Sequence, residues 1–274
     1  MISRFLNRNR EYIFCIVLLC VITGLNIYSY IDFAYKKSFY PIEGTNAFSF
    51  WYYVRTLNLG QILIFISPLI IIICGVSKLH DKLNSGIYQS ILLKKKYNKF
   101  ITKEIINSYL KSILIFPILS VFVFLIGIIG FGDKISILDS SLPILYLPVG
   151  LVNSPYIYYL RTIFLLVLYS IFIINIALIL MQFVKKYYLL IISSFIVINA
   201  INFIMSNILI IISKIVNSGT LYEFAINTNI YDGYSPESKL SIAFITIGIY
   251  TIISFLIIFI LYKKKERLID LYDW

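Results

Sequence analysis

The sequence predicts an all-α polytopic membrane protein with six transmembrane helices, and two observations support that fold class. Of the 274 residues, 60% are apolar and 17% aromatic, whereas only 14% are charged. A soluble domain of this size would need a surface made largely of hydrocarbon, which soluble proteins do not have. The charged residues also delimit uncharged runs of about 20 residues or more, which is long enough to cross a bilayer. These runs are 12–31, 56–77, 112–132, 162–184, 187–213 and 240–262.

The connectors between the runs are short, so we expect one membrane domain over residues 1–274. The first run follows basic residues, as a signal peptide does. No small-residue cleavage site comes after it, and we expect it to be retained as a span. A further uncharged stretch, 140–160, contains three prolines and is separated from the fourth run by Arg161 alone. We expect this stretch to be a re-entrant or surface-lying external segment.

The positions of the lysines and arginines predict the orientation, because basic loops stay in the cytoplasm. The connector 78–111 holds eight lysines, and further basic residues precede the first run, separate the fourth from the fifth and follow the sixth. Both termini and the net charge of +11 are therefore expected on the cytoplasmic face. Attraction to anionic lipid accounts for this charge, so nucleic acid is not an expected partner.

The chain does not carry the common catalytic motifs. None of the 12 glycines precedes a lysine, which excludes a P-loop for ATP. His80 is the only histidine, which removes most metal and triad chemistry. The three cysteines are not at metal-ligand spacing and are expected to pack as small apolar residues. The sequence therefore predicts neither an enzyme nor a cofactor or metal in this chain.

The connector between the second and third runs has a helical pattern. Leu79, Leu83, Ile87 and Ile91 recur every four residues with polar residues between them. This spacing predicts a short amphipathic helix at the inner membrane surface. Gly86 interrupts the pattern and suggests a bend or a close backbone contact. The pattern alone leaves two interpretations open, a membrane-attached loop and a helix that docks on a protein.

Several features of this region occur together in an order typical of one family. A span ends in small residues, and then come a polar turn with an acid, a Ser-Gly step, a hydrophobic patch, a basic cluster with an aromatic residue, and a lysine before the next span. Here they are Pro68, Gly75, Asp81, Ser85-Gly86-Ile87, Ile91-Leu92-Leu93, Lys94-Lys95-Lys96-Tyr97 and Lys103. In this order they resemble the permeases of ABC type-2 exporters, and six spans with both ends inside agree with that family. Lys82 stands where members commonly place a glutamate, and the usual proline before the basic cluster is absent.

The resemblance implies a coupling helix at 80–93 that docks on a separate cytoplasmic ATPase, which would bind the ATP and Mg. Two permeases, identical or different, would pair with two ATPases. The implied coupling residues are Asp81, Lys82, Leu83, Gly86, Ile87, Tyr88 and Ile91.

Two further segments are implied by the same resemblance. Residues 1–11 would form an amphipathic interface helix, and Ile2, Phe5 and Leu6 do share one helical face. Residues 207–218 would form a short re-entrant or surface-lying segment between the last two spans.

Polar side chains inside the runs form the other candidate site. They are Asn175, Asn199, Asn202, Thr246 and Tyr250. Such residues face protein or water, so they either make interhelical hydrogen bonds or line a substrate path. Gly127 and Gly130 in the third run are expected to allow close helix packing.

The aromatic residues leave a similar choice. Trp51, Tyr52 and Tyr53 precede the second run, where aromatic belts lie at membrane interfaces. An exit vestibule for a hydrophobic peptide or a lipid would have the same composition.

These features together predict a multi-pass permease in a bacterial plasma membrane. It would export an amphipathic or hydrophobic peptide, such as an antimicrobial peptide, with a lipid-like substrate less favoured. The alternative is a non-transporting immunity or sensor protein that binds a peptide or a partner.

Overall fold

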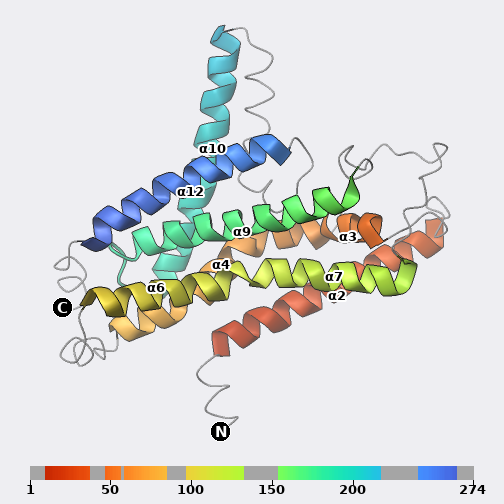
Figure 1. The fold of residues 1–274 in the computed structure, drawn as a ribbon, viewed down its shortest axis with the longest axis horizontal. Helices are drawn as coiled ribbons and strands as arrows, with labels where there is room; N and C mark the ends of the chain where they lie inside the picture. The colour runs from red at the N-terminus through yellow and green to blue at the C-terminus, as the bar shows by residue number, and fades with distance from the viewer. Residues whose placement is uncertain are drawn as a thin grey trace.

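A computed structural model describes residues 10–37, 47–56, 59–84, 97–132, 154–216 and 240–263. Every regular element in these ranges is an α-helix, so the all-α prediction is confirmed for them. The helices, shown in Figure 1, are α2 (Arg10–Lys37), α3 (Ala47–Thr56), α4 (Leu59–Asn84), α6 (Tyr97–Ile113), α7 (Ile115–Phe131), α9 (Pro155–Leu180), α10 (Tyr187–Val216) and α12 (Leu240–Lys263).

Within these ranges, five stretches of helix are long and apolar enough to cross a membrane. They are Arg10–Asp32, Phe100–Phe131, Pro155–Leu180, Tyr187–Val216 and Phe244–Tyr262. Each contains most or all of one run predicted from the sequence. The remaining run, 56–77, lies almost entirely in α4, which is not among the five and continues into a polar end with Lys78, Asp81 and Lys82. By length and composition this is a multi-pass membrane protein.

The third span begins earlier than its uncharged run, because α6 and α7 form one long helix that is interrupted only at Leu114. Pro117 explains the interruption. Proline has no N–H to donate to the carbonyl of residue 113, and its ring crowds that carbonyl. The helix resumes at once, since the Ile118 N–H donates to the Leu114 carbonyl oxygen at 3.0 Å.

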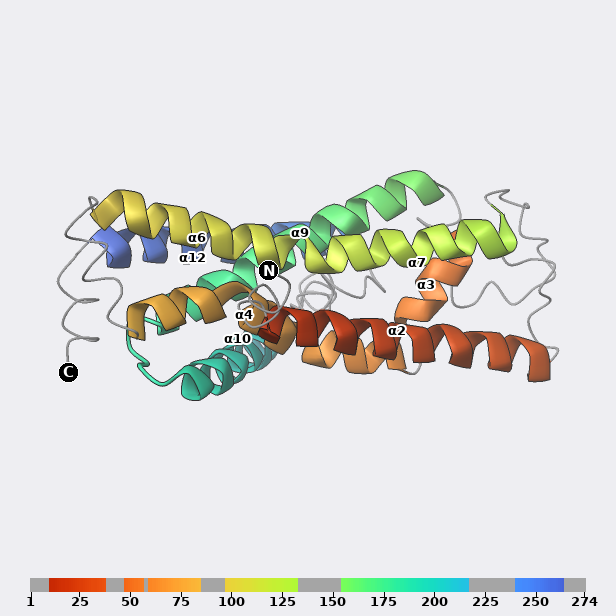
Figure 2. The ribbon, with the colours of Figure 1, turned by 90° about the horizontal axis from the view of Figure 1, so that it is seen from below.

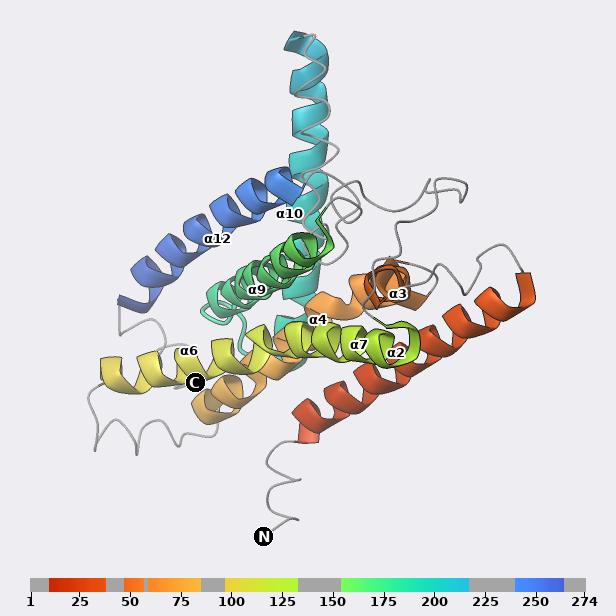
Figure 3. The same ribbon diagram turned by 45° about the vertical axis from the view of Figure 1, so that its right-hand side comes forward.

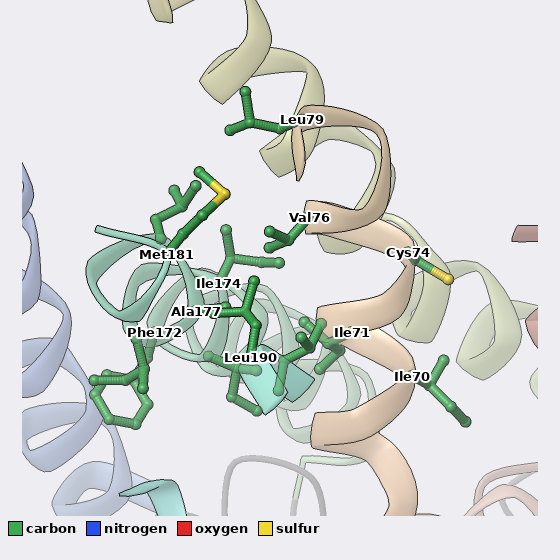
Figure 4. Close-up of a cluster of buried hydrophobic side chains, with 14 of the residues drawn as sticks. Ile70, Ile71, Cys74, Val76, Leu79, Phe172, Ile174, Ala177, Met181 and Leu190 are labelled. Atoms are coloured by element: carbon green, nitrogen blue, oxygen red, sulfur yellow. The ribbon is translucent and has the colours of Figure 1, made fainter. Parts of the chain in front are cut away.

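The central helix of the fold is α9. It packs against α12, α4, α10, α6 and α7, and it is apolar around its whole circumference, as expected of a buried helix. Figure 4 shows the core where α9 meets α4 and α10. Side chains of Ile71, Val76 and Leu79 from α4 gather there with Ile174 and Ala177 from α9, and α10 adds Leu190.

Most of the helices run along one axis in alternating directions. Figures 1 and 2 show α2 and the α6–α7 rod running one way, and α4, α9 and α12 running the other way. In contrast, α10 crosses the others and its C-terminal half projects from the bundle (Figures 1 and 3). A narrow stripe of Leu190, Ser194 and Ile198, four residues apart, is fully buried near its start. Most of the apolar surface of α10 is left for lipid or a partner to cover.

The helix α3 forms a second, aromatic core at the other end of the bundle from the α4–α6 connection. Phe48 and Trp51 are almost completely buried, so they form neither a membrane-interface belt nor an open vestibule in this structure. The Trp51 Nε1–H donates to Ser120 Oγ of α7 at 2.7 Å. Gly127 of α7 leaves room for α3, since a Cβ there would lie 3.1 Å from the Ala47 Cα. The close-packing role predicted for Gly127 is confirmed, whereas Gly130 has no neighbour within 4 Å of such a Cβ.

Candidate functional site

The helices α4 and α6 pack side by side, and residues 85–96 connect them in the sequence. An ion pair joins them near their ends, with Lys82 Nζ 2.6 Å from Glu104 Oε2. Glu104 is buried because it belongs to a stripe on α6 that faces the protein interior, with Phe100, Ser108 and Ser112 at four-residue intervals. The α4–α6 pair, meaning residues 75–84 and 97–112, therefore has a charged contact at its tip and small residues at its base.

Two further contacts hold the end of α4 to its neighbours. His80 Nε2 lies 2.7 Å from the Lys185 carbonyl oxygen in the turn between α9 and α10. Because a carbonyl can only accept, Nε2 carries the proton. The His80 ring also packs on Tyr187, with ring centroids 5.1 Å apart, and the Tyr187 hydroxyl donates to Glu11 Oε2 at 3.2 Å. The tip of α4 is thus connected to α2, α6 and α10.

The structure describes three of the seven predicted coupling residues, Asp81, Lys82 and Leu83. Asp81 is exposed, Lys82 is partly exposed in its ion pair, and Leu83 is 3% exposed. Leu83 therefore packs inside the chain instead of facing outward. Residues 80–84 are the last turns of α4, so the predicted coupling segment starts as a continuation of that helix. The remaining predicted coupling residues, Gly86, Ile87, Tyr88 and Ile91, lie outside the described residues.

The base of the α4–α6 pair is a tight crossing of three helices. A Cβ on Gly75 of α4 would overlap both Ser112 Oγ of α6 and Ile174 Cδ1 of α9. The Ser112 hydroxyl donates to the Ser108 carbonyl oxygen at 2.9 Å, which keeps it against its own helix. With no side chain at Gly75, the three helices approach closely enough that none can shift there without displacing the others.

Asn175, which follows Ile174 on α9, is the centre of a hydrogen-bond network. Its Oδ1 accepts from the Tyr109 hydroxyl of α6. Its Nδ2 donates to Ser254 Oγ of α12 at 2.7 Å, and that hydroxyl donates to the Thr251 carbonyl oxygen at 2.9 Å. Asn175 is completely buried. Both ends of its amide have partners in other helices, which favours the interhelical interpretation of this residue over the substrate path.

The other four residues of the predicted substrate path lie on two helices, α12 and α10. Thr246 is buried on α12, and the ring of Tyr250 packs on Phe172 of α9 with centroids 5.6 Å apart. Asn199 and Asn202 are on α10, and Asn199 Nδ2 donates within its own helix to the Phe195 carbonyl oxygen at 2.8 Å. Because α10 packs mainly on α9 and α4 while α12 packs on α9, these residues belong to different helix contacts.

Glu104 is an interacting residue that the sequence did not single out. It lies on α6, before the uncharged run 112–132. The available signal was the spacing of Phe100, Glu104, Ser108 and Ser112, which places small and polar residues on one helical face. In the part of the chain that the structure describes, no group of three His, Cys, Asp or Glu side chains could hold a metal ion.

Comparisons of this chain with protein-family models, with curated proteins and with solved structures find no match. The geometry of the α4–α6 pair and of the Asn175 network is therefore the basis for assigning a function.

Proposed function

We propose that this chain is the membrane subunit of an ATP-driven exporter in a bacterial plasma membrane. It would pair with a cytoplasmic ATPase and a second permease, and it would move an amphipathic or hydrophobic peptide. The observation that supports this proposal best is the α4–α6 pair, because its two helices end on either side of the segment that resembles a coupling helix. A partner that pushes on that segment would act on both helices at once.

The contacts within the bundle provide a route for such a push. The Lys82–Glu104 ion pair links α4 to α6 at the tip. At the base, Gly75 of α4 lies directly against Ser112 of α6 and Ile174 of α9. The next residue, Asn175, links α9 to α12 through Ser254. Since packed helices shift as bodies and do not deform continuously, force applied near residue 85 would reach α12 through these contacts.

A second candidate is a non-transporting immunity or sensor protein. It is favoured by the Asn175 network, in which the amide has partners at both ends and binds no substrate in this arrangement. Such a protein would bind a peptide or a partner without ATP-driven turnover, and it would need no ATPase.

The two candidates are separated by a test on the coupling segment. We expect Ile87→Asp to weaken ATPase binding markedly and to stop transport, because it puts a charge where the sequence pattern predicts an apolar contact. The spans should still insert, since their apolar length is unchanged. The measurement is a pull-down of whatever ATPase the neighbouring genes encode, together with ATP-dependent export.

Gln89→Asp is the matched control, because it adds the same charge at a polar position of the same pattern and should keep both binding and export. A complex that survives Ile87→Asp with normal export would exclude 85–96 as the coupling element. If the wild-type chain retains no ATPase, the sensor candidate is favoured instead.

A further inference from the structure

The rod formed by α6 and α7 has a weak point between its two halves. Pro117 has no N–H to donate to the preceding turn, and the regular helix is interrupted at Leu114. Just before the interruption, Ser108 Oγ donates to the Glu104 carbonyl oxygen at 3.0 Å, and Ser112 Oγ donates to the Ser108 carbonyl oxygen at 2.9 Å. Side-chain bonds of this kind within a helix often bend it. The rod is therefore expected to bend most easily at this point.

The half of the rod beyond the weak point, α7, is fixed to α3. The Trp51 Nε1–H of α3 donates to Ser120 Oγ of α7 at 2.7 Å, and the Ala47 N–H donates to the Gly132 carbonyl oxygen at 3.1 Å. Between these two contacts, Gly127 lets the backbones of α3 and α7 approach each other directly. Because α7 is held at both of these positions and packed closely between them, it has little room to tilt.

The other half, α6, is held by contacts of two kinds. Its end lies in the three-helix crossing, meaning the place where Ser112 meets Gly75 of α4 and Ile174 of α9 without room for a further side chain. Toward its start, the directional contact with α4 is the ion pair between Lys82 Nζ and Glu104 Oε2 at 2.6 Å. The apolar contacts around this pair add burial, but the hydrophobic effect has no direction and does not fix the angle between two helices. The angle of α6 to α4 therefore depends on one crossing and one ion pair.

We propose that residues 97–111 form an arm that pivots on the three-helix crossing, with the backbone at Leu114 as its hinge. The Lys82–Glu104 ion pair holds the arm against α4. Hinges are commonly a few residues at the end of an element that absorb the change in backbone angles. Glu104 is buried while the arm lies against α4, so without Lys82 its charge returns to water only when the arm moves away. The hinge is a property of the bundle alone, so it stands or falls separately from the transport proposal.

The test is the distance between two spin labels, measured by pulsed electron paramagnetic resonance on the full chain in lipid, with the three native cysteines replaced by serine. The labels are attached through Asp81→Cys on α4 and Lys103→Cys on α6, since both positions are exposed. A change of about 20° in the bend would move residue 103, about 14 Å along the helix from Ser112, by about 5 Å. We expect Lys82→Met, which removes the charge and keeps an unbranched side chain, to lengthen the distance between the labels by about this amount.

Two matched controls accompany this variant. Lys214→Met removes an exposed lysine at the end of α10 and should leave the distance between the labels unchanged. Pro117→Ala, added to Lys82→Met, supplies the missing N–H and stiffens the hinge, so it should reverse most of the lengthening. Pro155→Ala should not reverse it, because Pro155 stands in the first turn of α9, where its missing N–H would have no helical partner.

Two further label pairs make the test independent of folding defects. Asp81→Cys with Lys186→Cys joins the tip of α4 to the turn between α9 and α10, and Leu125→Cys with Lys186→Cys joins α7 to the same turn. Both distances should stay as in the wild type when Lys82→Met is introduced, because only the arm moves. Four results would each overturn the proposal: no lengthening in Lys82→Met, equal lengthening in Lys214→Met, an equal change in either further pair, or equal reversal by Pro117→Ala and Pro155→Ala.

Discussion

At the scale of single residues, small and polar side chains determine where the helices of this protein meet. Inside a membrane the hydrophobic effect does not hold helices together, because lipid is as apolar as they are, so packing and hydrogen bonds take over. Gly75 shows the first contribution, since any side chain there would overlap α6 and α9. Asn175 shows the second, since it bonds to Tyr109 and Ser254 on two other helices.

The position of Asn175 leads to a prediction about stability. Asn175→Leu keeps the number and branching of the side-chain heavy atoms but removes both hydrogen bonds and leaves Tyr109 and Ser254 without those partners. We expect it to lower the free energy of unfolding by about 1–2 kcal/mol, measured by thermal unfolding in detergent. Asn207→Leu is the control, because the exposed Asn207 amide bonds only within its own helix, to the Phe203 carbonyl oxygen at 2.7 Å. Unchanged stability together with lost transport in Asn175→Leu would instead favour a substrate path.

The sequence was sufficient to identify Asn175 as a residue that needs a hydrogen-bond partner, but it was not sufficient to predict which residues those partners are. An asparagine in a long apolar run must find a hydrogen-bond partner, so its importance was visible from the sequence. Tyr109 and Ser254 lie 66 and 79 residues away along the chain. Which of many tyrosines and serines meets Asn175 depends on how three helices cross, and no local pattern contains that information.

At the scale of elements, α3 is a helix that the sequence pattern did not predict. Its ten residues, Ala47–Thr56, end where the uncharged run 56–77 begins, and such a helix is too short to span a membrane. Its ends are held by other helices: the Ala47 N–H donates to the Gly132 carbonyl oxygen at 3.1 Å, and the Asn26 amide of α2 donates to the Val54 carbonyl oxygen. Both bonds use backbone groups that a short helix leaves unpaired at its ends.

The packing of α3 on α7 is open to a direct test. In Gly127→Leu the new side chain would overlap Phe50, whose Cδ1 is 2.9 Å from the position of a Cβ. We expect α3 to move away, at a cost of about 1–3 kcal/mol in unfolding free energy, and Trp51 to become accessible to acrylamide quenching. The measurement needs a Trp274→Phe background, so that Trp51 is the only fluorophore of its kind. Gly130→Leu, at a site with open space, should leave the quenching unchanged, and equal quenching in both variants would contradict this packing.

Hydropathy located the apolar helices but not their ends. The α6–α7 rod extends 15 residues before its uncharged run, which begins at residue 112. Glu104 in that extension pairs with Lys82 at the charged end of α4, and the helix continues through it. A charge therefore indicates where a span leaves the apolar layer, whereas the end of the helix depends on backbone capping and on neighbouring helices.

At the scale of the whole molecule, the helices run in directions that bring their basic ends to the same end of the bundle. The ends of α4 and α12 that carry basic residues lie at one end of the bundle, together with the start of α6, and α3 lies at the other end (Figures 1 and 2). Clustering of basic residues at one end is what the positive-inside rule requires of helices that alternate across a membrane. The orientation we propose has the α4–α6 tip in the cytoplasm, where an ATPase could reach it.

This orientation is tested by labelling single cysteines in whole cells, after Cys15, Cys20 and Cys74 have been replaced by serine. A membrane-impermeant maleimide added outside should label cysteine at positions 134 and 237 without permeabilisation. Cysteine at positions 95 and 265 should react only after the cells are opened, because these positions lie in the basic segments that the sequence assigns to the inside. Labelling of position 95 in intact cells would reverse the orientation. The α4–α6 tip would then face away from any cytoplasmic ATPase, and the exporter proposal would lose its physical basis.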